Sequence, residues 1–409
     1  MRKMKDSGVE WIGEIPKDWN CMRLKFAFGN SNVGESVDKE LYSSDENGYI
    51  FYTAGANPVK TSYTEFPMWK YTTDNDILLA RNGTPYIYLP SKDAVYSDHI
   101  IRINIKDGYC RRFLRYCLQR SIESIIVDSV SIATWSISLW KEQKLPLPYY
   151  HEQKYLADYL DSKCSKIDEI IEKQQAIIKK LKEYKFSIIT EAVTKGINPD
   201  VEMKDSGSVW FGNIPINWEM KRLKYVFHIQ KDIAGEEGHT VLSITQRGII
   251  PKDFSNNEGQ FANSYANYQL VHKGDFAMNH MDLLTGWVDI SKYEGVTSPD
   301  YRVFVLNDKN GMCPKYYLYM MQMCYSARIF YGLGQGVSGM GRWRLQADKF
   351  LNFYIPIPPY DEQKKIADYI TDKVNHIEVE IDKRNKLIKK YQEYKKSLIY
   401  EVVTGKKEV

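Results

Sequence analysis

A long segment with apolar side chains at alternating steps of four and three residues occurs twice in this chain. The stretch from Glu152 to Thr194 aligns without a gap with the stretch from Glu362 to Thr404, so each residue lies 210 positions before its counterpart. An average spacing of about 3.5 residues is typical of a coiled-coil seam rather than of the broader apolar face of a globular helix. The seam positions of the two copies are Leu160, Cys164, Ile167, Ile171, Ile178, Leu181 and Ile188, and Ile370, Val374, Ile377, Ile381, Ile388, Tyr391 and Leu398.

A second repeat precedes each of these segments. The motif Trp-x-Gly-x-Ile-Pro-x-x-Trp occurs at Trp11–Trp19 and again at Trp210–Trp218, within longer matches of residues 4–28 and 203–227. A repeat this long is not a solenoid, so the chain is a tandem duplication in which each half is a domain followed by a long helix. The Gly and Pro residues favour a rigid irregular segment, and we expect its tryptophans to anchor the segment to its domain.

The predicted fold class is α+β, with two tandem α/β domains separated by two long antiparallel coiled-coil helices in a pseudo-twofold arrangement. The variable blocks, about 29–145 and 228–355, contain short strand patterns such as 76–80, 100–105 and 303–306, and helical patterns at 111–124 and 315–330. Each block ends in a Pro-x-Pro sequence, which we expect to stop the domain because proline continues neither a strand ladder nor a helix interior. The predicted boundaries are 1–150 for the first domain, 151–196 for the first long helix, 197–360 for the second domain and 361–405 for the second long helix.

The two long helices are expected to pair with each other. A long helix with a narrow apolar seam is unstable alone, and the only matching seam in the chain is its own copy. The short segment 195–202 cannot span the return path of about 60 Å that a parallel pair needs, so the pair should be antiparallel. Both seams are interrupted at the same slots, by Gln174 and Arg384 and by Lys185 and Lys395. Polar residues at such slots either fix the register of the pair or extend to solvent.

Composition places the chain among ordinary globular proteins. Hydrophobic residues make up 43% and charged residues 26% of the sequence. The apolar runs are far shorter than the roughly 20 residues of a membrane helix, and we expect no secretory signal. Six cysteines without a Cys-x-x-Cys pair favour free thiols in a reducing cytoplasm and argue against structural zinc. The net charge of +4 permits nucleic-acid binding but does not by itself indicate it.

No catalytic constellation is evident in the sequence. Pro358-Pro359-Tyr360 is similar to the end of the Asn-Pro-Pro-Tyr motif of amino-methyltransferases, but Ile357 stands where the asparagine would bind the target amine. The glycines between positions 332 and 341 are not followed by Gly-Lys-Ser/Thr, so they do not form a phosphate-binding loop. We therefore expect that this chain is not an enzyme.

The order of the motifs resembles the specificity subunit of type I restriction–modification systems, and the resemblance covers essentially the whole chain. It is carried by the two Trp motifs and by Pro-x-Pro followed by Glu-Gln-x-x-Ile/Leu-Ala-Asp-Tyr and a long helix. The Asp76-Ile-Leu-Leu-Ala-Arg-Asn-Gly-Thr run, and the Lys273-Gly-Asp-Phe stretch with Thr297-Ser-Pro299, also match the family pattern.

This resemblance implies that each variable block is a target recognition domain that reads one half of a bipartite double-stranded DNA sequence. It implies that the long helices set the half-site spacing and dock two modification subunits, with Leu160, Ile167, Ile171, Ile178, Leu181, Ile370, Ile377, Ile381, Ile388 and Leu398 as the helix positions involved. Two restriction subunits would complete the complex. S-adenosylmethionine, ATP and Mg²⁺ would be held by these partner subunits, and this chain would bind no cofactor or metal. The implied protein is cytoplasmic and has no membrane contact.

Two stretches differ between the otherwise matching halves. Residues 129–135 precede the first Pro-x-Pro, and the longer, glycine-rich residues 332–344 precede the second. Two domains with one frame and different loops should recognise different half-sites, so we predict an asymmetric target. Candidate DNA contacts are Ser129, Ser131, Gln335, Ser338, Arg342 and Arg344 in these stretches, and Arg81, Asn82, Thr84, Tyr86, Asn279 and His280 in turns after two strands. A purely structural role as a turn or surface residue stays open for each.

Two other classes of function are compatible with parts of the sequence. One is a structural adaptor, in which two protein-binding domains are held apart by a coiled coil; the modest net charge and the 31 tyrosines fit it. The other is a self-contained DNA methyltransferase or nuclease, which the missing catalytic motifs disfavour.

Overall fold

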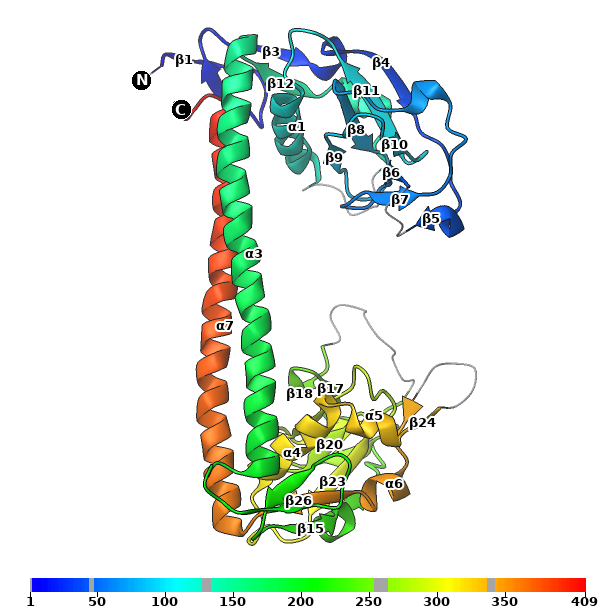
Figure 1. The fold of residues 1–409 in the computed structure, drawn as a ribbon, viewed down its shortest axis with the longest axis vertical. Helices are drawn as coiled ribbons and strands as arrows, with labels where there is room; N and C mark the ends of the chain where they lie inside the picture. Colours follow the sequence, from blue (N-terminus) through cyan, green and yellow to red (C-terminus); the bar gives the residue numbers. More distant parts are fainter. Residues whose placement is uncertain (1, 44–47, 127–133, 254–263, 337–342) are drawn as a thin grey trace. The chain divides into compact units, whose positions relative to one another are not determined.

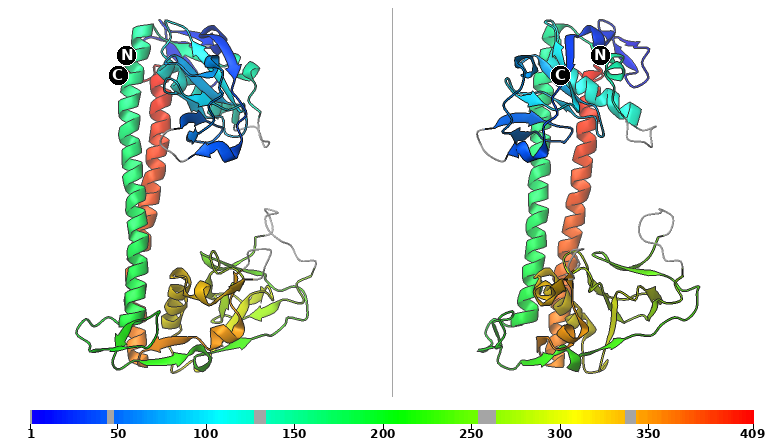
Figure 2. Two further views of the ribbon diagram at one scale, coloured as in Figure 1. Left: turned by 45° about the vertical axis from the view of Figure 1, so that its right-hand side comes forward. Right: turned by 90° about the vertical axis from the view of Figure 1, so that its right-hand side faces the viewer.

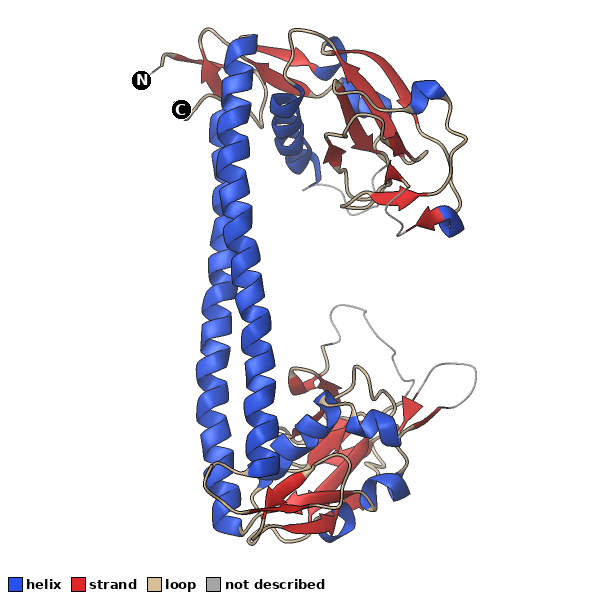
Figure 3. Cartoon of the chain, in the orientation of Figure 1, coloured by secondary structure: helices blue, strands red, loops and turns tan. Residues whose placement is uncertain are grey.

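The computed structural model of the protein describes residues 2–43, 48–126, 134–253, 264–336 and 343–409. The chain forms two compact units: unit 1 comprises Met1–Gln174 and Asn385–Val409, and unit 2 comprises Gln175–Arg384. Each unit contains one domain of helices and strands together with a segment of each long helix (Figure 3). This confirms the α+β class. Within the described ranges, no helix has the length and hydropathy that crossing a membrane requires.

The two long helices are continuous (Figure 1 and, from other sides, Figure 2). Helix α3 spans Tyr150–Lys195 and helix α7 spans Tyr360–Val403. Gly196 and Gly405 lie shortly after the helix ends with φ angles of 78° and 71°. This left-handed conformation ends a helix and favours glycine, which has no Cβ to clash with the backbone.

In unit 1, the first part of α3 packs against the last part of α7 in the antiparallel direction. Leu160 shares one apolar core with Leu398. Arg2 connects the start of α3 to the end of the chain, because its guanidinium donates to Glu152 at 2.5 Å and its backbone N–H donates to Glu408 at 2.9 Å.

In unit 2, the remaining parts of the same helices also run antiparallel. Ala192 shares a core with Ile366 and Ile370, and Lys185 lies 2.7 Å from Glu378. Residue numbers therefore fall along α3 as they rise along α7. The predicted antiparallel pairing is confirmed in each unit.

Two equivalent ion pairs join the helices at the interrupted slots of the seam. Lys185 pairs with Glu378 in unit 2, and Lys395 pairs with Asp168 at 2.6 Å in unit 1. The two pairs occupy the same positions of the repeat, because 210 residues separate both the lysines and the carboxylates. Partly exposed ion pairs contribute only about 0–1 kcal/mol each to stability. Their main effect is therefore on the register of the helices, which is one of the two roles that the sequence left open.

The domain of unit 1 is built on a four-stranded antiparallel sheet of order β4-β11-β8-β9. The strands are β4 (Phe28–Val33), β8 (Asp76–Ala80), β9 (Ile87–Tyr88) and β11 (Ile100–Ile105). Residues Ile77 and Ile103 of this sheet share a core with helix α1 (Arg111–Ile126) and with the long helices. A second sheet, of order β10-β6-β7-β5, consists of β5 (Tyr42–Ser43), β6 (Tyr49–Tyr52), β7 (Val59–Thr61) and β10 (Val95–Tyr96).

Unit 2 repeats the central sheet with the order β16-β23-β20-β21. Its strands are β16 (Phe227–Gln230), β20 (Phe276–Met278), β21 (Val288–Ile290) and β23 (Arg302–Leu306). Two two-stranded antiparallel ladders replace the second sheet: the hairpin of β17 (Leu242–Thr245) with β18 (Gly248–Pro251), and the pair of β19 (Gln269–Val271) with β22 (Gly295–Thr297), which are separated in the chain by β20 and β21. The helix predicted over 315–330 is split into α4 (Pro314–Ser326) and α5 (Ile329–Leu333), because Arg328 between them is left-handed with φ 57°.

The Trp motifs begin each unit with a short hairpin, β1 (Met4–Asp6) with β2 (Glu14–Pro16) and β13 (Met203–Asp205) with β14 (Asn213–Pro215). Trp19 and Trp218 are fully buried in the two main cores, as expected for anchors. Trp210 leaves 42% of its surface exposed, and its ring lies against Gly332 of the same domain.

The first proline of each Pro-x-Pro sequence lies in a short strand, so the premise that proline cannot continue a ladder is wrong here. The strands nevertheless end at Leu147 and Ile357, before the long helices begin. Strand β12 (Lys144–Leu147) pairs with β3 (Asn20–Arg23), and β26 (Tyr354–Ile357) pairs with β15 (Glu219–Arg222). Each ladder has only two strands. The missing N–H of the proline can therefore point to the unpaired edge, where no ladder bond is lost.

A buried glutamine joins each domain to its long helix. In unit 1, the Gln153 amide accepts from the Cys110 N–H at 2.9 Å and donates to the Pro148 carbonyl at 2.9 Å. In unit 2, Gln363 accepts from the Cys313 N–H at 3.0 Å and donates to the Pro358 carbonyl at 2.9 Å. The same bonds recur 210 residues apart because the Glu-Gln motif places this amide where the first turn of the helix meets the domain.

Replacing Gln153 with Leu should destabilise unit 1, because a buried N–H and a buried carbonyl lose their partners. We expect the free energy of unfolding to fall by about 2–4 kcal/mol. Gln363→Leu should have the same effect on unit 2. Urea unfolding combined with hydrogen exchange would show which unit is weakened. The exposed Gln392→Leu is the control, and wild-type stability of the Gln153→Leu protein would contradict this role.

Candidate nucleic-acid interface

In unit 1, two loops that are far apart in the sequence meet where strand β8 ends. The Trp135 N–H donates to the Arg81 carbonyl at 2.6 Å, and Asn82 forms an isolated β-bridge with Thr134. Arg81 follows β8 directly, and Trp135 precedes the short helix α2 (Ile137–Lys141). The turn after β8 and the stretch before Pro-x-Pro are therefore adjacent.

Unit 2 contains the same connection at the end of strand β20. The Leu345 N–H donates to the His280 carbonyl at 3.0 Å. Leu345 precedes helix α6 (Ala347–Leu351) and follows a two-stranded ladder of β24 (Gln335–Gly336) and β25 (Trp343–Arg344). In both units, the structure thus brings together the two stretches that the sequence proposed separately.

Most of the candidate side chains in unit 1 already have partners inside the domain. The Arg81 guanidinium donates to the Asp98 carbonyl at 3.2 Å, and the Asn82 amide lies 3.0 Å from His99 Nδ1. The Tyr86 ring is half-buried, with its centroid 6.1 Å from that of Tyr88. Thr84 is exposed.

The candidates in unit 2 divide into buried and exposed groups. The Asn279 side-chain oxygen accepts from the N–H groups of Met281 and Asp282, both at 3.2 Å, so this asparagine shapes the turn. His280 is buried. Gln335 and Arg344 are exposed and lie opposite each other in the β24–β25 ladder. Four other candidates, Ser129, Ser131, Ser338 and Arg342, lie outside the described residues.

His280 is surrounded by positive charge. Burial, followed by the cations Arg302, Arg344 and Lys231, lowers the pKa of His280 to about 3, so the ring is neutral at pH 7. Its Nδ1 atom has no hydrogen-bond partner among the described residues. The sequence analysis missed Arg302 and Lys231. The sequence pattern that could have indicated Arg302 is a single arginine at the start of the otherwise apolar strand Arg302–Leu306.

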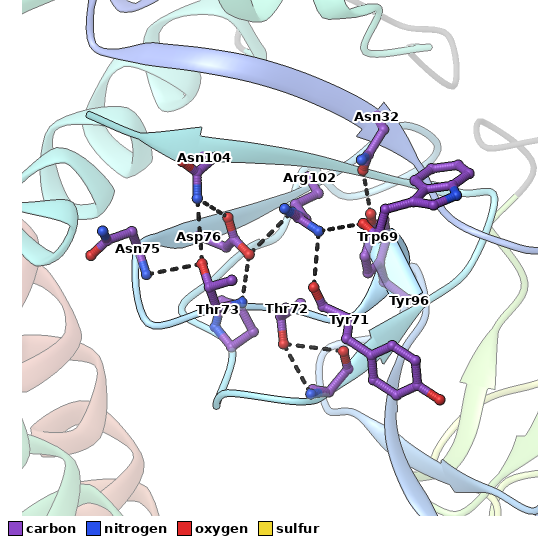
Figure 4. A network of polar contacts seen from close by, with 12 residues as sticks. Asn32, Trp69, Tyr71, Thr72, Thr73, Asn75, Asp76, Tyr96, Arg102 and Asn104 are labelled. Carbon is purple, nitrogen blue, oxygen red and sulfur yellow. Dashed lines mark hydrogen bonds and ion pairs between the residues drawn. The ribbon is translucent and has the colours of Figure 1, made fainter. Parts of the chain in front are cut away.

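Unit 1 also has an arginine on the central sheet, the partly buried Arg102, but its charge is neutralised within the domain (Figure 4). The Arg102 Nε lies 3.1 Å from a carboxylate oxygen of the fully buried Asp76, and its Nη1 donates to two backbone carbonyls at 2.7 and 2.9 Å. Asp76 also accepts from the Thr73 N–H at 2.6 Å. In unit 2, Asp275 accepts from the His272 N–H at 2.8 Å in the same way. The aspartates thus organise the turn before the central strand in both units.

Comparison with known proteins identifies the family. A sequence profile described as the Type I restriction modification DNA specificity domain matches residues 16–188 and 215–390. The chain belongs to this family. The two matched ranges correspond to the two halves of the duplication, so the chain carries two specificity domains in tandem.

Similar proteins cover nearly the whole chain. The MjaVIII specificity subunit of a type I restriction enzyme from Methanocaldococcus jannaschii is 25% identical, over 96% of this chain and 93% of its own length. The putative MjaX specificity subunit from the same organism is 24% identical over 97% of this chain and 95% of its own length. A chain in a solved structure of a type I restriction–modification system has the same fold, with a TM-score of 0.67 and 13% identity over 96% of this chain and 99% of that one.

The predicted helix positions lie on the seam beside the two specificity domains. Leu160, Ile167, Ile178, Ile370, Ile377, Ile381 and Leu398 are buried, and Ile171, Leu181 and Ile388 are partly buried. These side chains therefore serve the contact between the helices. A role in docking a partner stays a prediction for them.

The histidine in the second specificity domain should make stability depend on pH. His280 stays neutral in the folded protein down to a pKa of about 3, whereas an unfolded histidine takes up a proton below about pH 6.5. Stability is therefore complete above about pH 6.5 and falls as the pH decreases toward 3, by roughly 2 kcal/mol at pH 5.

Urea unfolding at pH 7.5 and pH 5 would measure this loss. His280→Gln should remove it from the difference between the two pH values. The exposed His376→Gln is the control, because that ring is solvated in both folded and unfolded protein. An equal pH dependence of wild type and His280→Gln would show that the ring is not held neutral.

Proposed function

We propose that this chain is the DNA-recognition subunit of a type I restriction–modification complex and that each specificity domain reads one half of a bipartite target. The observation that carries this proposal is that the two units share their scaffold but differ in the residues at the ends of equivalent strands. The central sheets, the glutamine joints and the helix ion pairs recur in both units. The groups beside the ends of β8 and β20 differ, with Arg81 and Asn82 in one and His280, Gln335 and Arg344 in the other.

Exposed polar side chains next to positive charge suit contacts with DNA. Arginine contacts both phosphates and the guanine edge, and glutamine pairs with adenine in the major groove. Arg344 and Gln335 project from adjacent strands, and the Gln346 amide donates to the Gln335 side-chain oxygen at 3.0 Å. In unit 1 the exposed Thr84 follows the anchored Arg81 and Asn82 in the same turn.

The long helices would set the spacing between the two DNA half-sites and carry the partner subunits. The proposed complex contains double-stranded DNA, two modification subunits and two restriction subunits. S-adenosylmethionine, ATP and Mg²⁺ are assigned to those partners, and this chain is proposed to be non-catalytic and cytoplasmic. Two equivalent modification subunits fit a chain whose surfaces occur twice.

One exposed aromatic pair is a candidate for these docking surfaces. Tyr184 on α3 and Tyr394 on α7 are equivalent residues of the repeat, and they leave 55% and 51% of their surface exposed. Tyrosine at the centre of an interface often contributes strongly to binding. Each unit carries one of the two residues, as two equivalent docking sites require.

The target of the complex should be asymmetric. We expect that co-expression with the modification subunit produces adenine methylation at a bipartite motif whose two halves differ. Methylome sequencing of such cells measures it directly. A palindromic motif would contradict the inference that the two domains read different sequences. If no methylated motif is found and the chain binds proteins but shows no salt-dependent binding to DNA, the structural adaptor would be favoured instead.

Removing one exposed tyrosine should weaken the binding of one modification subunit only. Tyr184→Ala and Tyr394→Ala should each reduce the affinity for one of two subunits by roughly tenfold or more, and the double variant should weaken both. Native mass spectrometry of the assembled complex would count the bound subunits. The control is Tyr155→Ala, an exposed tyrosine whose counterpart in the repeat is Lys365. Full occupancy by two subunits in the double variant would exclude this surface.

A further inference from the structure

Arg302 occupies a position of the central sheet that is apolar in the other unit. It lies opposite Met278 in the pairing of β23 with β20, as Ile101 lies opposite Leu79 in the pairing of β11 with β8. Both Ile101 and Arg302 are buried, with exposures of 2% and 5%. The fold therefore accepts an aliphatic side chain at this place, and the arginine is not a requirement of the sheet.

The contacts of Arg302 connect it to the loop that carries the exposed Arg344. Its Nη2 donates to the Leu345 carbonyl at 2.8 Å, and its guanidinium lies 4.9 Å from the centroid of the Phe350 ring. Leu345 in turn donates to the His280 carbonyl. Arg302 thus holds the backbone next to Arg344 against the central sheet.

The charge of Arg302 has no carboxylate partner among the described residues. No ion pair includes it there, and its Nη1 has no hydrogen-bond partner. The adjacent residues 337–342 contain no Asp or Glu in the sequence. Arg344 and Lys231 add positive charge near the His280 imidazole, as Arg302 does. In the described part of the chain, no ion pair includes Arg344 or Lys231. Among the described residues, no carboxylate therefore forms an ion pair with Arg302, Arg344 or Lys231, which we call the cation group.

The neutralised Arg102 shows what a purely structural arginine looks like in this fold. Its partner Asp76 is part of the same domain, and its donors reach carboxylate and carbonyl oxygens. Burying a charge without such a partner costs several kcal/mol. Burial and the nearby Arg344 lower the pKa of Arg302 to about 10, so it is still charged at pH 7. A ligand with a negative charge that binds next to Arg302 would supply the partner that the described part of the domain does not provide.

We propose that Arg302 is a positioning residue of the second specificity domain, which holds β25 so that Arg344 contacts a DNA phosphate, and that this phosphate supplies the negative charge that the cation group lacks. The inference rests on the proposed function, because it assumes that unit 2 faces DNA. A phosphate is the ligand expected, since charge-assisted bonds from arginine to phosphate are strong and Arg302, Arg344 and Lys231 are all positively charged donors. Arg302 itself does not contact the phosphate. It holds the Leu345 backbone through its hydrogen bond and adds positive electrostatic potential at the site.

The test uses the chain assembled with its modification subunits and a duplex that carries the methylated motif of the wild-type complex. Arg302→Met removes the charge and the bond to Leu345, whereas Arg302→Lys keeps the charge. We expect Arg302→Met to bind the duplex roughly tenfold more weakly, with the slope of log affinity against log salt smaller by about 0.9. Arg302→Lys should recover most of the affinity and the slope.

Two controls separate this role from folding and from the other domain. Ile101→Met places the same residue at the equivalent position of unit 1 and should leave binding unchanged. Arg302→Met should melt at or above the wild-type temperature, because it removes a buried charge that has no described carboxylate partner, and Arg302→Lys should melt near the wild type. Scrambling the half-site read by unit 2 should abolish the difference between Arg302→Met and wild type, and scrambling the other half-site should not.

The outcomes distinguish the inference from the proposed function. Wild-type affinity and salt slope for Arg302→Met would overturn the inference alone. Affinity that simply follows the melting temperature in the Met and Lys variants would assign Arg302 to the scaffold and also overturn it. If the wild-type complex methylates no motif and binds no duplex, the proposed function and the inference fall together.

Discussion

A helix of more than forty residues with a single narrow apolar stripe keeps its shape in water only when another helix covers that stripe. In each unit, a segment of one long helix covers the apolar stripe of the other. The apolar residues of both segments belong to the same core as the domain. Leu160 and Leu398 share a core with Trp19 and Trp140, and Ala192 and Ile370 share one with Trp218. The helix pair is therefore part of the hydrophobic core of each domain. Unit 1 cannot complete its core before Asn385–Val409 has been added, although its own domain is the first in the chain.

The polar groups where domain and helix meet are repeated more faithfully than the domain interiors. Gln153 and Gln363 make the same two bonds, and the tyrosines of α1 and α4 both reach the long helix, Tyr116 to Asp161 at 2.7 Å and Tyr319 to Thr371 at 3.0 Å. These groups are buried or half-buried, where an unpaired donor or acceptor is costly, so their substitution is constrained in pairs. The exposed positions near the ends of β8 and β20, such as Thr84, Gln335 and Arg344, are free of this burial constraint. The sequence can change there without loss of the contact between domain and long helix. Two recognition domains that share one scaffold but bind different sequences need this property.

The duplication, the antiparallel helices and the central strands were accessible from sequence because each depends on periodicity, which survives changes of individual residues. The split of the helix at Arg328 was not, because a non-glycine residue in the left-handed region leaves no mark on the apolar pattern. The strands formed by the Pro-x-Pro sequences were missed for a related reason. Proline excludes a central strand but not a ladder with one free edge, and the number of strands in a ladder is a tertiary property. The sequence proposed the candidates after β8 and β20 and the stretches before Pro-x-Pro separately, because their adjacency is a tertiary property. It also could not show that Asn279 is used by its own turn or that His280 is buried.

The partly buried Arg102 and the buried Arg302 show how one fold supports two electrostatic environments. Arg102 and Arg302 lie on equivalent central strands, but their side chains occupy positions of opposite parity: Arg102 lies opposite Leu78, and Arg302 lies opposite Met278, the counterpart of Leu79. Because successive side chains of a strand point to opposite faces, a shift of one position moves the cation from the side of Asp76 to the side of Leu345 and Phe350. On the first side the aspartate that organises the turn neutralises it. On the second side no described carboxylate does, and the arginine stays a source of positive potential beside Leu345 and Phe350. A change of strand face, without any change of fold, is thus enough to separate an arginine with an internal carboxylate partner from one without a described partner.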